Sequence, residues 1–127
     1  MTVLAFASVA GGGCKMPADQ SGCVCTQDFR FLIITVRDGS GQPVTGVSIT
    51  VTQVRTGQVL AVQQGAPTAG IYVILDDSFK SQISSSAETL HVVGQKGTSS
   101  FAVDYSVAVD SCGCHVSKVS GPDSITL

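Results

Sequence analysis

Two pairs of cysteines near opposite ends of the chain constrain its fold more than any other feature. Both pairs have the spacing Cys-x-Cys, and they comprise Cys23 and Cys25, and Cys112 and Cys114. Thiols so far apart in sequence tie both ends of a domain together if they bind each other or a common metal ion. His115 follows the second pair directly. The candidate roles are therefore a metal site, a haem site, a redox dithiol or two disulfides.

The composition predicts an all-β domain. A chain of 127 residues is one domain by the usual length prior, and it is long enough to bury roughly two-thirds of its unfolded surface. Val outnumbers Leu, Glu88 is the only glutamate, and Thr, Ser and Gly are abundant. This mixture favours pleated, half-buried strands over helices.

The low charge of the chain argues against nucleic acid as a partner. Charged residues make up 13% of the chain, against about 25% in an average soluble domain. The net charge of −2 leaves no basic face for nucleic acid, and no apolar run approaches the roughly 20 residues that span a bilayer. Neutral faces of Ser, Thr and Gln repel one another weakly, which suits a subunit packed among copies of itself.

Residues 1–13 are apolar, small and uncharged. The stretch from Val3 to Ala10 resembles the apolar core of a secretory signal, although it lacks a basic residue before it. Three glycines precede Cys14, in a loose likeness to a bacterial lipobox, so Cys14 is either a lipidation site or a free or cross-linking thiol. A lipid on Cys14 is the only membrane attachment that the sequence predicts.

If this segment is retained in the mature protein, it needs something to cover it. Adding to the sheet edge of a neighbouring subunit is one physically sensible way. The candidate assembly strand comprises Val3, Leu4, Ala5, Phe6, Ala7 and Val9. We therefore expect residues 1–28 to form an N-terminal strand and connector, and residues 29–127 to form the folded domain.

Turn signals recur about every 8–12 residues from Phe29 onward, as in sandwiches and barrels. The clearest period-2 strand is Val47–Val54, where Val47, Ile49 and Val51 alternate with Ser and Thr. The other expected strands are 29–38, 58–64, 71–77, 89–95, 101–110 and 124–127, and residues 78–88 are expected to cross between sheets. The pattern predicts about seven or eight strands.

The stretches VRDGSGQPVTGVSITV (36–51) and TAGIYVI (68–74) resemble the carboxypeptidase regulatory-like, or transthyretin-like, β-sandwich family. The motif joins two strands through a turn in which Pro43 fixes φ, and it later enters a core strand at Gly70 and Tyr72. The late D-x-C-x-C-H-V run is similar to the closing strand of secreted and lipoprotein members. The resemblance implies an immunoglobulin-like two-sheet sandwich that acts as an accessory, binding or structural module and seldom as a catalyst.

Disulfides are the favoured role of the cysteines. Haem attachment needs C-x-x-C-H, one residue more than is present here, and a redox dithiol needs a helix that the sequence does not predict. A four-thiolate metal site remains the alternative, although an extended Cys-x-Cys sets its sulfurs about 7 Å apart. In an immunoglobulin-like sandwich, antiparallel segments would pair Cys23 with Cys114 and Cys25 with Cys112; the swapped and local pairings stay open.

The remaining polar residues favour structural roles. We expect His115 to follow Cys114 into the last strand, and His91 to lie on a solvated face. Asp38 is expected to cap its own turn, and Asp76 and Asp77 are weak candidates for calcium. Two tyrosines, Tyr72 and Tyr105, are interpreted as strand aromatics. No G-x-S-x-G elbow is present, so no hydrolase is predicted.

The sequence therefore predicts a non-catalytic, disulfide-stapled structural subunit at the cell surface, without a cofactor. We expect it to assemble with copies of itself, as in a filament, through its N-terminal strand. The alternative is a monomeric, lipid-anchored module that binds carbohydrate or peptide, and a structural-metal domain is the third hypothesis.

Overall fold

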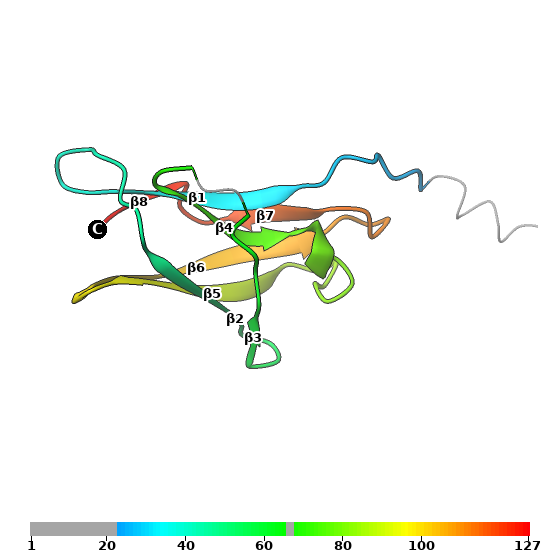
Figure 1. Ribbon diagram of the computed structural model, residues 1–127. Helices are drawn as coiled ribbons and strands as arrows, with labels where there is room; N and C mark the ends of the chain where they lie inside the picture. The colour runs from blue at the N-terminus through cyan, green and yellow to red at the C-terminus, as the bar shows by residue number, and fades with distance from the viewer. Residues whose placement is uncertain (1–22, 66–67) are drawn as a thin grey trace, which may run out of the picture.

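The structure is a computed structural model, and it describes residues 23–65 and 68–127. It contains eight strands and a short 3-10 helix, η2, arranged in two layers (Figure 1). Their bounds are β1 (Phe31–Arg37), β2 (Ser48–Gln53), β3 (Gln58–Leu60), β4 (Ile71–Asp76), η2 (Asp77–Phe79), β5 (Glu88–Lys96), β6 (Ser99–Val109), β7 (Val116–Ser120) and β8 (Ser124–Thr126). Cys14 and the candidate assembly strand, residues 3–9, lie outside the described residues.

The strands form one sheet of three and one of five. The three-stranded sheet has the order β4-β1-β8, and the five-stranded sheet has the order β3-β2-β5-β6-β7. Every pairing is antiparallel except that of β1 with β8, which is parallel. The prediction of an all-β fold with two sheets and seven or eight strands is confirmed.

The predicted alternation of Val47–Val54 places a core strand where we expected one. Val47 and Val51 are buried between the sheets, and Ser48 and Thr50 face solvent. Gln53 continues the inward-facing side of β2, at 2% exposure. Its amide donates to the carboxylate of Glu88, because a buried polar group needs a partner.

Strand β1 has two apolar faces, and within residues 23–65 and 68–127 only one of them is covered. Ile34 and Val36 are fully buried in the core. On the opposite face Phe31 and Ile33 remain 53% and 44% exposed. The three-stranded sheet thus presents apolar side chains on its outer surface.

Residues 58–64 depart from the expected long strand, because regular pairing ends at Leu60. Gln64 instead contacts β4 through its side chain. Its Nε2 donates to the carbonyl of Val73 over 3.0 Å, and its Oε1 accepts from the N–H of Val73 over 2.8 Å. The amide therefore occupies backbone groups of β4 that a further strand would otherwise pair.

Two tyrosines fasten turns to the core, which confirms their interpretation as strand aromatics. The hydroxyl of Tyr72 donates to the carbonyl of Val44 and accepts from the N–H of Val47. Tyr105 donates to the carbonyl of Pro122, and burial raises its pKa to about 12. Asp38 caps its own turn as expected, since its Oδ1 accepts from the N–H groups of residues 40 and 42.

The chain changes sheets between β7 and β8. β7 belongs to the five-stranded sheet and β8 to the three-stranded sheet. Gly121 lies in the connection with a φ of +136°, and a Cβ there would lie 2.3 Å from the ring of Tyr105. Only glycine fits this position, so the connection stays short and carries β7 directly into β8.

Candidate functional site

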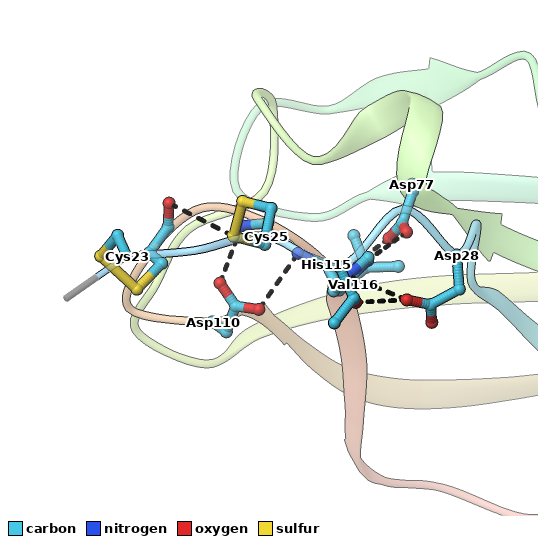
Figure 2. Close-up of a disulfide and its surroundings, with 10 residues drawn as sticks. Cys23, Cys25, Asp28, Asp77, Asp110, His115 and Val116 are labelled. Carbon is cyan, nitrogen blue, oxygen red and sulfur yellow. Dashed lines mark hydrogen bonds and ion pairs between the residues drawn. A yellow bond between two sulfur atoms is a disulfide. The ribbon is translucent and has the colours of Figure 1, made fainter. Parts of the chain in front are cut away.

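Two disulfides hold residues 23–30, here called the arm, against the loop that precedes β7 (Figure 2). Cys23 is bonded to Cys112 and Cys25 to Cys114. Each pair has a Cα–Cα distance of 5.3 Å and a sequence separation of 89 residues. The prediction that these four cysteines form two disulfides between the ends of the chain is confirmed.

The predicted connectivity, Cys23 with Cys114 and Cys25 with Cys112, is wrong. It assumed that the second pair ends a strand running back toward the first pair. Instead the second pair precedes β7, which leads into β8, and β8 runs parallel to β1. The arm and the 110–115 loop enter their strands from the same end of the sandwich (Figure 1), so the two Cys-x-Cys segments run in the same direction and pair first with first.

The alternative of a four-thiolate metal site conflicts with this bonding. A zinc ion binds cysteine as the thiolate, and all four sulfurs are here joined to one another. Within residues 23–65 and 68–127, no group of three or more His, Cys, Asp or Glu side chains is arranged to hold a metal ion.

Asp77, the first residue of η2, accepts hydrogen bonds from three donors beside the arm. Its Oδ2 accepts from the Nδ1 of His115 over 2.6 Å and from the N–H of Arg30 over 2.9 Å. Its Oδ1 accepts from the N–H of Val116 over 2.8 Å. Burial alone would raise the pKa of Asp77, but these hydrogen bonds outweigh it and hold the pKa below its usual value.

His115 joins Asp77 to the arm, and the residue is only 7% exposed. Its Nε2 lies 2.8 Å from the Oγ1 of Thr26 and 3.6 Å from the Oδ1 of Asp28. Thr26 donates a hydrogen bond to Asp28, and this bond, with a second from Arg30, lowers the pKa of Asp28 to about 2. One ring nitrogen of His115 therefore faces the carboxylate of Asp77. The other faces the hydroxyl of Thr26 and the carboxylate of Asp28. Both carboxylates have a lowered pKa.

Asp110 shapes the loop that carries the second cysteine pair. Its Oδ1 accepts from the N–H of Cys114 over 2.8 Å, and its Oδ2 accepts from the N–H of His115 over 3.1 Å. The bond from Cys114 is the main reason that the pKa of Asp110 is lowered. Gly113 supplies the left-handed φ of +71° that this tight loop requires. The loop thus presents both sulfurs to the arm.

The hydroxyl, imidazole and carboxylate of Thr26, His115 and Asp77 follow the order of a hydrolase triad. The Thr26 hydroxyl, however, donates to Asp28, so its proton is not directed at the imidazole. Chemically, the arrangement is a chain of hydrogen bonds between two carboxylates. It crosslinks the arm, β7 and η2 next to the two disulfides.

The sequence patterns identified some of this site and missed the rest. His115 precedes β7, which is not the last strand as predicted, because β8 follows it. His91 lies on the solvated face, as expected, and is paired with Asp104. Asp76 and Asp77, considered for calcium, accept N–H groups instead, since Asp76 caps η2 through Ser78. The contact of Thr26 with His115 was not predicted, because nothing local to either residue indicates it.

Within the described ranges, no helix has the length and apolar character needed to cross a membrane. The two disulfides fit an oxidising compartment. Searches against family models, curated proteins and solved structures returned no match for this chain.

Proposed function

We propose that this protein is a non-catalytic, extracellular structural subunit that assembles with copies of itself at the cell surface, as in a filament, through residues 3–9. The observation that carries the proposal is the locked arm. Two disulfides and the Asp77–His115 pair fix Cys23 at one end of the sandwich. Whatever precedes Cys23 is thereby attached at a fixed position, as an assembly segment requires.

The outer surface supports self-association. Phe29, Phe31 and Ile33 are 52%, 53% and 44% exposed, and adjoining exposed apolar side chains mark interaction sites more often than isolated ones do. The chain that precedes the arm is itself apolar and uncharged over residues 3–9. If the exposed side chains of the sandwich meet residues 3–9 of another copy, apolar groups on both are removed from water, which favours association.

The geometry of the turns supports an immunoglobulin-like sandwich of the carboxypeptidase regulatory-like type. Gly70 has a φ of +78°, and a Cβ there would lie 2.7 Å from the Cβ of Pro43. Tyr72, two residues later, bonds the far side of the same turn through Val44 and Val47. The residues that carry the resemblance thus contact one another. On that basis we propose this type of sandwich for the protein.

Sedimentation velocity on the full chain tests the assembly. Phe6→Asp places a charge within the apolar segment, and we expect it to weaken self-association at least tenfold while the sandwich stays folded. Gln20→Asp adds the same charge to the polar connector, and we expect it to associate like the wild type. Unchanged association of Phe6→Asp would overturn the proposal.

A second candidate function is a lipid-anchored binding module. A shallow cavity of about 390 Å³ opens at the end opposite the arm, and its lining includes Asp38, Val44 and Lys96. The charged groups of Asp38 and Lys96 suit a polar carbohydrate or peptide ligand. Attachment through Cys14 would be detected by mass spectrometry of the mature N-terminus, since lipidation requires cleavage immediately before that cysteine.

A further inference from the structure

We propose that the acceptor for this assembly is the free edge of β4, where residues 3–9 of a second copy add as a strand and displace the side chain of Gln64. The inference rests on the proposed function and names the surface to which the segment binds. It follows from the backbone of β4, from two cavities beside it and from the position of the arm.

The hydrogen bonds of Gln64 mark the edge of β4 as a strand-binding position. β4 lies at the edge of the three-stranded sheet. The donor and acceptor of the Gln64 amide bind the C=O and N–H of Val73, as the peptide groups of an adjacent strand do. An incoming strand can replace each of the two hydrogen bonds that the Gln64 side chain makes. The exchange therefore leaves neither the N–H nor the C=O of Val73 unpaired.

Two apolar cavities flank Gln64. One, of about 280 Å³, is lined by Phe31, Gly65 and Val73 as well as Gln64. The other, of about 220 Å³, has a lining that includes Gln64, Gly46, Gly70, Ile71 and Tyr72. A strand lying along β4 would cross both cavities.

The apolar segment matches these cavities in its pattern of side-chain sizes. Side chains two residues apart on a strand point to the same face and lie about 7 Å apart. Leu4 and Phe6 have this spacing and are the largest side chains between Val3 and Val9. We therefore assign Leu4 and Phe6 to the cavities on either side of Gln64.

The exposed aromatic pair extends the acceptor surface. The rings of Phe29 and Phe31 are packed edge to face, with centroids 5.1 Å apart, and both side chains are about half exposed. Phe31 also lines the larger of the two cavities beside β4. An added strand would cover this pair together with the cavity.

The position of the arm favours a second copy as the donor. The arm extends beyond the start of β1, at the end of the sandwich where β4 ends (Figure 1), and its disulfides fix it there. Residues 10–22 span at most about 45 Å when extended, which suffices to carry residues 3–9 to a neighbour placed end to end. We therefore assign the donor segment to a second copy.

Substitution of the acceptor surface in the full chain tests this assignment. Phe31→Lys places a charge at the cavity beside Gln64, and we expect self-association to weaken at least tenfold in sedimentation velocity. Val59→Lys is the matched control, since Val59 is 58% exposed on the edge strand β3 of the other sheet. Circular dichroism and thermal unfolding establish that both variants are folded.

Mixing two defective variants identifies the donor. Phe6→Asp cannot donate and Phe31→Lys cannot accept, so each remains monomeric alone. Mixed in equal amounts, they should form one-to-one dimers, because the intact segment of Phe31→Lys enters the intact acceptor of Phe6→Asp.

The outcomes separate the acceptor from the proposed function. If Phe31→Lys associates like the wild type while Phe6→Asp does not, assembly stands and the β4 acceptor is overturned. If the mixed variants stay monomeric, donation by a second copy is overturned, since a segment that covers its own chain gives that result. If Phe6→Asp itself associates normally, the proposed function fails as well.

Discussion

The Nδ1 of His115 lies 2.6 Å from the Oδ2 of Asp77, and this contact joins residues 38 positions apart in sequence. Asp77 follows β4, and His115 precedes β7. Both side chains are at least nine-tenths buried. Because the other nitrogen of His115 faces Thr26, the pair connects the arm to both sheets without a covalent bond.

Replacement of Asp77 by Asn should destabilise the domain. The Asn side chain keeps one carbonyl oxygen, but its amide nitrogen would face the N–H donors of Arg30 or His115. Leaving buried donors without their acceptor costs about 1–3 kcal/mol each, so we expect a loss of about 3 kcal/mol in urea unfolding. Asp123→Asn, at a 92% exposed carboxylate paired with Lys118, should change the free energy of unfolding by less than about 0.5 kcal/mol.

The same substitution should change the acid sensitivity of the domain. The pKa of Asp77 is lowered in the folded state, so the unfolded chain binds the proton first as pH falls below about 4. Stability from Asp77 is then complete at neutral pH and is lost as pH falls toward the folded pKa. The gap in Tm between wild type and Asp77→Asn should be constant above about pH 5 and narrow below about pH 4. A constant gap down to about pH 2 would contradict this.

The two disulfides should contribute non-additively to stability. With Cys25–Cys114 intact, Cys23–Cys112 closes only a small additional ring, so its removal by a double Ser substitution should cost about 2 kcal/mol. Removal of both pairs also opens a loop of about 90 residues and should cost about 6–7 kcal/mol in total. Urea unfolding of the three proteins measures both values. If removal of both bonds costs only twice as much as removal of Cys23–Cys112 alone, the two bonds act independently.

Glu88 is the buried carboxylate of a second network, and its neutralisation should be costly. It accepts hydrogen bonds from the side chains of Gln53 and Arg55 and from the N–H of Ser84. Burial alone would raise the pKa of Glu88, and these donors together lower it. Glu88→Gln should reduce the free energy of unfolding by about 2–3 kcal/mol.

The exposed pair of His91 and Asp104 gives the control for Glu88. The two side chains are 46% and 64% exposed, and ion pairs in water contribute little. Asp104→Asn should therefore change the free energy of unfolding by less than about 0.5 kcal/mol. A larger effect than that of Glu88→Gln would show that burial does not decide the strength of these contacts.

Gly70 should not tolerate alanine. Its φ is +78°, and the added Cβ would lie 2.7 Å from the Cβ of Pro43 and 3.0 Å from the carbonyl oxygen of Val36. Strain and overlap together should cost about 2–4 kcal/mol. Gly39→Ala, with nothing within 4 Å of its Cβ and no positive φ, should leave Tm nearly unchanged.

Local patterns in the sequence predict most of the strands. Alternation over Val47–Val54 places β2, which spans Ser48–Gln53, because burial of one face depends on residues two apart. The run 58–64 was predicted too long, since Gln64 contacts β4 through its side chain instead of continuing the strand. Nothing in a short window distinguishes these two uses of a polar residue.

The candidate site depends on relationships that local patterns do not contain. The cysteines were identified from their spacing, but their pairing follows from the step of the chain between sheets at Gly121. The contact of Asp77 with His115 requires that the end of β4 meets the start of β7. Both contacts depend on the topology. The residues of the site could therefore be identified from the sequence, but which of them contact one another could not.

The disulfides also determine how the molecule would respond to a pulling force. Cys25 is bonded to Cys114, and the chain continues from there through β7 and β8 to Leu127 at the opposite end (Figure 1). Tension between Cys25 and Leu127 therefore bypasses residues 26–113. Extension is limited to about 50 Å while the bonds are intact, and it rises to about 350 Å once they are reduced. An oxidised subunit pulled between these two points would therefore stretch little, because residues 26–113 lie outside the path that carries the load.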